Sequence, residues 1–285
     1  MSKQWILSAA VAMLILAGCT PKLQTPTDVC PGKRSVNKAL AALQFNSQNM
    51  VPFRADGQCY LEYYAEGKDK PSRESLVVQQ LWVEPPVNLY LQGDKPLISK
   101  MVILGSNERE FWLAIRPEIS LYVWGRWSEQ ESSEGPVINP RTLLEALGIG
   151  DIDIREDWSL SNKGAYDILT KRERGAVTKK IHIFSCDYRV RKIEFFDSNG
   201  QVAALAELDK YKDVSEGFHV PALIKVTTYN EIERDKPFTF TLKLQRLRLT
   251  EITEPRRKYL FTRKPPDGFK NVGRIVNGEL INESQ

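Results

Sequence analysis

Residues 75–93 read SLVVQQLWVEPPVNLYLQG, two apolar runs on either side of Pro85-Pro86. Both runs are rich in Val, Leu and aromatic residues and are bounded by Pro, Asn or Gly, which is typical of β-strands joined by tight connections. The same pattern continues in ISKMVILG (98–105), REFWLAIRP (109–117) and SLYVWGRW (120–127). This stretch therefore predicts a succession of short strands with hairpin-length turns.

Further strands are predicted on both sides of this stretch. RVRKIEFF (189–196) and QVAALAEL (201–208) form a predicted hairpin across Asn199-Gly200, a strong short-range turn signal. In the last strand the apolar phase changes at Gln245-Arg246, where a β-bulge would restore one apolar face. The remaining strands are FRADGQCYLEYYA (53–65), AYDILTKRE (165–173), KKIHIFSCD (179–187), HVPALIKVTTYN (219–230) and FTFTLKLQRLRLTE (238–251).

Two helices interrupt the strands. Residues 35–45 place apolar residues on one helical stripe after Ser35, a suitable N-cap. Residues 139–148 begin with Asn139 and Pro140 and stop at Gly148, as helices commonly do. About eleven antiparallel strands with two or three helices predict a mainly β, α+β protein. A strongly curved half-barrel wrapped around its helices would hide the apolar face and can leave a cavity open at one end.

The N-terminus carries a predicted export signal. Lys3 precedes the apolar run WILSAAVAMLILA (5–17), which is shorter than the roughly 20 residues that span a bilayer. Leu16-Ala17-Gly18-Cys19 resembles the lipobox of bacterial lipoproteins. This resemblance implies cleavage before Cys19, attachment of acyl chains such as palmitate to it, and firm membrane anchoring. The alternative is an ordinary signal peptide with an incidental cysteine.

The division of the chain follows from this signal. Residues 1–18 are the predicted lipoprotein signal peptide, residues 19–34 the lipidated cysteine with a flexible tether, and residues 35–285 a single domain. Residue 20 is Thr rather than Asp, which in enterobacteria-like sorting implies the periplasmic face of the outer membrane. Loss of Lys3 changes the formal net charge from +4 to +3, too weak to indicate nucleic acid.

Three cysteines remain after the anchor. Cys30, Cys59 and Cys186 would lie in an oxidising compartment, and an odd number allows one disulfide at most. A Cys30–Cys59 bridge would fix the end of the tether to the first strand, and we predict this pairing. The alternative is three buried thiols. There is no CxxC motif, which disfavours redox catalysis.

The order of elements resembles the LolA/LolB-like lipoprotein-carrier superfamily from Val36 to about Phe269. The motifs that carry the resemblance are LWVEPPVNLYL (81–91), GSNEREFWLAIRP (105–117), FFDSNGQ (195–201), HVP (219–221) and the strand from Phe238. The resemblance implies an incomplete, bent antiparallel barrel with lid helices, and acyl chains of lipoproteins or lipids bound on its concave apolar face. Soluble carriers of this family lack a lipid anchor, so anchored receptor-like or lipid-transfer members are nearer.

Motifs for catalysis are missing from the sequence. His182 and His219 lack metal-ligand spacing, and each is interpreted as a satisfied core or surface histidine. GxSxG, a P-loop and a dinucleotide loop are absent, so we predict no enzyme, no cofactor and no metal. A carboxylate pair assembled only in space stays open as a hydrolase alternative. Basic groups at 189–192, 246–248 and 256–258 fit a solvated face or, less well, phosphate headgroups.

These features favour a binding protein over an enzyme. The first hypothesis is a protein that holds acyl chains in an apolar cavity, for transport or localisation at the outer membrane. The second is a structural or sensory lipoprotein with a filled interior that binds a protein or cell-wall partner. The residues predicted to line the cavity are Leu61, Leu81, Trp82, Val83, Leu89, Leu91, Leu113, Trp124, Ile183 and Leu242.

Overall fold

The computed structural model describes residues 28–64, 67–116, 120–129, 140–149, 152–229, 233–277 and 279–283. The helix α2 (Val36–Gln48) comes before the first meander. This meander consists of β1 (Phe53–Tyr63), β2 (Ser72–Glu84), β3 (Asn88–Lys95), β4 (Ile98–Ser106), β5 (Glu110–Ile115) and β6 (Leu121–Arg126), and it is followed by the 3-10 turn η1 (Trp127–Glu129). The second part is α3 (Pro140–Ala146), β7 (Asp157–Lys163), β8 (Tyr166–Glu173), β9 (Ala176–Phe184), β10 (Val190–Phe196), β11 (Val202–Ser215), β12 (Phe218–Thr228) and β13 (Phe238–Leu244). The C-terminal part is β14 (Arg248–Leu249), α4 (Glu254–Leu260), β15 (Asn271–Val276) and β16 (Glu279–Asn282).

All of the described strands belong to one sheet built from two meanders. The spatial order is β16-β15-β6-β5-β4-β3-β2-β1-β13-β12-β11-β10-β9-β8-β7, with β14 paired to β1. The meanders β1–β6 and β7–β13 join where β1 pairs with β13, Cys59 lying opposite Leu242. The mainly β class and strong curvature are confirmed. The sheet has sixteen strands rather than about eleven, its strands do not follow sequence order throughout, and β15 runs parallel to β6.

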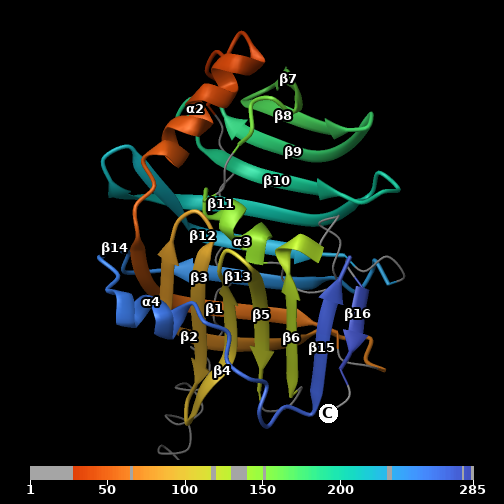
Figure 1. Ribbon diagram of the computed structural model, residues 1–285. Helices are drawn as coiled ribbons and strands as arrows, with labels where there is room; N and C mark the ends of the chain where they lie inside the picture. Colours follow the sequence, from red (N-terminus) through yellow and green to blue (C-terminus); the bar gives the residue numbers. More distant parts are fainter. Residues whose placement is uncertain are drawn as a thin grey trace, which may run out of the picture.

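The sheet bends sharply, and two helices lie on its inner side. In Figure 1, β2 to β6 run steeply through the lower half, whereas β8 to β12 cross the upper half. The helix α3 lies inside the bend and contacts β4 from one half and β11 and β12 from the other. The helix α2 lies at the upper edge against β7, β8 and β12. The third helix, α4, packs outside the bend, where its Leu260 joins a separate apolar cluster.

The strand β1 shows how the sequence sets the two faces. Phe53 and Ala55 are buried in the inner core, while Arg54 between them is exposed, as alternation along a strand requires. The register between β1 and β2 shifts between Ala55 and Gly57, where Asp56 lies opposite both Gln79 and Gln80, so the bulge lies in β2. One extra residue lies where a bulge was predicted at Gln245-Arg246: β13 ends at Leu244, and between the pairs Gly57–Leu244 and Arg54–Arg248 β1 advances three residues while the C-terminal segment advances four. Leu247 then packs against the inner core, whereas Leu249 is exposed.

The helix ends follow the predicted capping rules where they are described. Ser35 is the N-cap of α2, and its hydroxyl accepts a hydrogen bond from the Lys38 backbone N–H at 3.4 Å. The helix α3 begins at Pro140, and Gly148 follows it with φ +76°, a conformation that favours glycine. Asn139, the predicted cap of α3, lies outside the described residues. No helix in the described ranges has the length and apolar character needed to cross a bilayer.

Candidate functional site

A continuous apolar surface covers the inner side of the bend. Eight of the ten predicted cavity residues belong to one core cluster, and each is at most 6% exposed. They come from both meanders, which brings residues far apart in sequence onto one concave face. The eight are Leu61, Leu81, Val83, Leu89, Leu91, Leu113, Ile183 and Leu242.

The two predicted tryptophans lie elsewhere. Trp82 falls between Leu81 and Val83 on β2, so alternation directs it to the opposite face, where it packs with Leu260 and Phe261 near α4. Trp124 packs against a third cluster, and its ring is stacked by Arg263 and Arg274. The structure therefore does not bring these tryptophans together with the eight inner residues.

The helix α3 fills the bend. Leu143 and Leu147 are fully buried, and Leu144 is nearly so. At its edge the Glu145 carboxylate accepts a hydrogen bond from Lys179 on β9 at 2.7 Å, and both side chains are largely shielded from water. This ion pair fixes α3 to the second meander. The sequence predicted this helix and a curved sheet wrapped around its helices, and the structure places the leucines of α3 inside that bend.

The helix α2 covers the inner face through a narrower contact. Its buried side chains are Ala39, Leu40 and Leu43, whereas Phe45 is 60% exposed. One polar bond to the sheet comes from the His219 backbone N–H, which donates to Asn46 Oδ1 at 2.9 Å. The helix α2 is thus attached to the sheet by three buried apolar side chains and a few hydrogen bonds, a smaller contact than that of α3.

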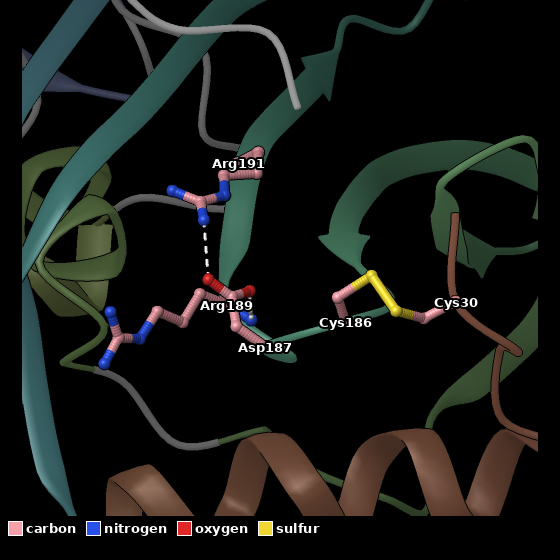
Figure 2. Close-up of a disulfide and its surroundings, with 5 residues drawn as sticks. All are labelled: Cys30, Cys186, Asp187, Arg189 and Arg191. Atoms are coloured by element: carbon pink, nitrogen blue, oxygen red, sulfur yellow. Dashed lines mark hydrogen bonds and ion pairs between the residues drawn. A yellow bond between two sulfur atoms is a disulfide. The ribbon is translucent and has the colours of Figure 1, made fainter. Parts of the chain in front are cut away.

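A disulfide fixes the chain just before α2. Cys30 bonds to Cys186 in the turn after β9, so the predicted Cys30–Cys59 bridge is wrong. Cys59 is a free, buried thiol whose pKa is raised by burial. Figure 2 shows the bridge beside the turn that leads to β10, where Asp187 accepts a hydrogen bond from Arg191 at 2.6 Å. The sequence could not identify the partner because the 156-residue separation carries no local signal.

A buried carboxylate reinforces this attachment. Asp167 on β8 is fully buried and accepts hydrogen bonds from the Lys33 backbone N–H at 2.7 Å and from the Tyr188 hydroxyl at 3.2 Å. Asn162 donates a third at 2.5 Å. At Gly32 a β-carbon would lie 2.0 Å from Asp167, so only glycine fits there. The described end of the predicted tether, residues 28–34, is thus bonded to the sheet.

The two histidines of the second meander are both partly buried. His182 hydrogen-bonds Glu194 at 2.6 Å, and burial lowers its pKa despite the carboxylate. Burial likewise lowers the pKa of His219. No group of three His, Cys, Asp or Glu residues in the described ranges is placed to hold a metal ion. The inner face of the bend is lined by apolar side chains.

Comparison with known proteins identifies solved structures with a similar fold, but no match to a family model or a curated protein. No family model matches the chain, and no curated protein matches it. A putative outer membrane lipoprotein-sorting protein domain from Vibrio parahaemolyticus aligns with a TM-score of 0.52 at 13% identity, covering 78% of this chain and 97% of that chain. A DUF1329 family protein from Desulfovibrio piger gives 0.50 at 13% identity, with 80% and 98% covered.

A third solved structure carries the superfamily name. It is a LolA superfamily protein from Nitrosomonas europaea, with a TM-score of 0.48 at 14% identity, covering 81% of this chain and 99% of that chain. At these identities the likeness concerns fold alone. The single curved sheet, the helices inside its bend and the Vibrio and Desulfovibrio matches agree with the fold predicted from the sequence. The chain has a LolA-like fold.

Proposed function

We propose that this protein is a membrane-anchored, periplasm-facing lipoprotein that binds acyl chains of lipids or lipoproteins on its inner apolar face. Binding would serve transport or localisation at the outer membrane, without catalysis. The observation that carries the proposal is a continuous apolar concave face covered by a helix, α2, that is attached through only three buried side chains. The name of the Vibrio relative, a lipoprotein-sorting domain, supports the same class of function.

Displacement of α2 by a ligand is energetically feasible. Burying a leucine side chain contributes about 1.5–3 kcal/mol, so uncovering Leu40 and Leu43 costs about 3–6 kcal/mol. An acyl chain of about 15 CH₂ groups gains about 12 kcal/mol when it leaves water, at about 0.8 kcal/mol each. Even after the ordering cost of binding, a chain that replaces α2 on the sheet has a favourable balance. The more deeply buried α3 would stay in place.

The test weakens the contact of α2 and measures acyl binding. In the unlipidated Cys19→Ser protein, Leu40→Ala removes a buried side chain from the closed form, which costs about 2–5 kcal/mol. Because the open form lacks this contact, the open population rises and a fluorescent fatty acid should bind about tenfold more tightly or better. Phe45→Ala is the matched control, since Phe45 is exposed on the same helix and its loss should leave the affinity unchanged.

Two results would contradict acyl binding through α2. One is a Leu40→Ala protein that is destabilised in urea but binds no more fatty acid than the parent. The other is absence of any uptake by either protein, together with no lipid co-purified from bacterial membranes and detected by mass spectrometry. An equal gain in Leu40→Ala and Phe45→Ala would show non-specific adsorption.

The filled inner face favours a second candidate. The eight inner residues are at most 6% exposed, so this structure has its concave surface occupied by its own side chains. A structural or sensory lipoprotein that presents its outer surface to a protein or cell-wall partner would need no open cavity. Failure of the fatty-acid test in a protein that is otherwise folded would favour this candidate over the first.

A further inference from the structure

Three arginines gather on the outer face of the sheet, behind the apolar surface. Arg54 on β1 lies directly opposite Arg248 on β14 and, on its other side, opposite Trp82 on β2. These three side chains therefore form one row across three strands. Arg256 reaches the same place from α4. Like charges placed directly opposite each other on a sheet contribute no stability.

Trp82 holds two of these guanidinium groups. The guanidinium carbon of Arg256 lies 4.9 Å from the centre of the indole ring, and that of Arg54 lies 5.6 Å from it. The indole itself is only 5% exposed and donates to Gln80 Oε1 at 3.1 Å, so its position is fixed. A guanidinium that stacks on an aromatic ring keeps its N–H donors at the edge available for a ligand.

These side chains surround a pocket of about 370 Å³. Its lining includes Arg54, Arg246, Arg248, Arg256, Asp56 and Trp82. Asp56 is bonded to Arg246 at 2.7 Å. Within the described part of the chain, none of Arg54, Arg248 and Arg256 forms an ion pair with a carboxylate.

Arg257, the next residue of α4, has a structural role. Arg257 donates to Glu84 at 2.6 and 2.9 Å and also pairs with Glu254. These bonds raise the pKa of Arg257 and lower that of Glu84. Arg257 thus holds α4 to β2, whereas its neighbour Arg256 faces a pocket with excess positive charge. Arg257 therefore contributes to the stability of the fold. The stability of the fold does not explain why Arg54, Arg248 and Arg256 converge.

We propose that this pocket binds a phosphate-bearing ligand. A phosphate group offers up to two negative charges and three acceptor oxygens, which suits three guanidinium groups better than a single carboxylate does. The volume leaves room for the group to which the phosphate is attached. The same chemistry is found in a phospholipid headgroup and in soluble phosphate compounds. Because Arg54 is exposed on the outer face while its neighbour Phe53 is buried in the inner core, the arginines of the pocket lie on the opposite side of β1 from the proposed acyl site.

The experiment measures binding of two probes to the unlipidated Cys19→Ser full chain. Inorganic phosphate is titrated while backbone NMR shifts are followed, and vesicles of phosphatidylcholine with or without phosphatidylglycerol are tested by co-sedimentation. Arg248→Gln is the first variant, since Arg248 is exposed and can be removed without loss of packing. Arg54→Gln and Arg256→Gln follow. Arg73→Gln, an exposed arginine on β2 remote from the pocket, is the control of equal charge.

We expect each pocket variant to weaken binding about tenfold or more, because a charged hydrogen bond is lost, while Arg73→Gln changes it little. Loss confined to inorganic phosphate would identify a soluble ligand, and loss confined to phosphatidylglycerol vesicles would identify a lipid headgroup. The proposal fails if neither probe binds the parent protein. It also fails if Arg248→Gln and Arg73→Gln weaken binding equally, which would indicate only the general attraction of a basic surface.

Discussion

The residue Cys30 connects the N-terminal segment to the second meander. Its bridge to Cys186, the Lys33 backbone bond to Asp167 and the Lys33 ammonium over the Tyr188 ring all act within four residues of sequence. They fix the chain to the sheet immediately before α2. As a result, the start of α2 would stay close to the sheet if ligand binding uncovered its apolar stripe, as we propose.

Removing the bridge should destabilise the folded protein. We expect the double variant Cys30→Ala/Cys186→Ala to lower the free energy of unfolding by about 2–5 kcal/mol, because the unfolded chain regains the freedom that the cross-link removes. Urea unfolding followed by tryptophan fluorescence measures this. Treating the parent with a reductant should reproduce the loss. An unchanged unfolding midpoint, or a peptide map in which Cys30 is bonded to Cys59, would contradict the pairing.

At the residue scale, side-chain alternation accounts for the eight predicted residues that belong to the inner core cluster, and their role in lining a cavity stays a prediction. Leu89 and Leu91, two apart on β3, point the same way whatever strand lies beside them. Trp82 was misplaced because its apolar character alone does not say which face it joins, and its neighbours Leu81 and Val83 already occupied the inner one. The row formed by Arg54 and Arg248 could not be predicted, since it depends on pairing between strands almost two hundred residues apart.

At the scale of elements, β1 is the junction of the two meanders. It pairs with β2 on one side and with β13 and β14 on the other. Gly57 allows the close approach, because a β-carbon there would lie 2.0 Å from the Lys243 carbonyl oxygen on β13. A glycine inside a strand otherwise weakens it, so its presence here reflects this contact.

The substitution Gly57→Ala should therefore separate β1 from β13. We expect it to lower the free energy of unfolding by at least about 2 kcal/mol, since backbone cannot move aside as a side chain can. Gly67→Ala is the comparison. Gly67 has φ +70°, and a β-carbon added there would meet no atom within 4 Å, so about 1 kcal/mol is expected from backbone strain alone. Equal losses in the two variants, measured by urea unfolding, would contradict the close contact.

Elements with a weak apolar pattern could not be predicted from the sequence. The strand β7 reads DWSLSNK, and its only alternating apolar residues are Trp158 and Leu160, which are partly buried against the core. All four residues of β16 are exposed, and such edge strands leave little periodic trace in their side chains. The helix α4 has seven residues and a proline near its start, too short for a helical period to be recognised.

At the scale of the whole molecule, the predicted attachment to a membrane rests on residues outside those the structure describes. Cys19 lies among them, so its lipidation stays a prediction. We expect Cys19→Ser to move the protein from the membrane fraction to the soluble fraction and to abolish incorporation of labelled palmitate. The Cys30→Ala/Cys186→Ala variant, which keeps Cys19, should remain in the membrane fraction. Retention of the Cys19→Ser protein in membranes would show that another feature provides the anchor.

The sequence by itself determined most of the segments that become strands, which side chains along one strand share a face, and that the apolar face needs a helical cover. These properties depend on local periodicity and capping, and neighbouring residues are enough to establish them. The tertiary structure alone decided that β1 pairs with β13, that Cys30 bonds to Cys186, and that Arg54, Arg248 and Arg256 surround one pocket. The physical reason is that alternation fixes the face of a side chain but not its partner strand, which is selected only when the whole sheet bends and closes over α3.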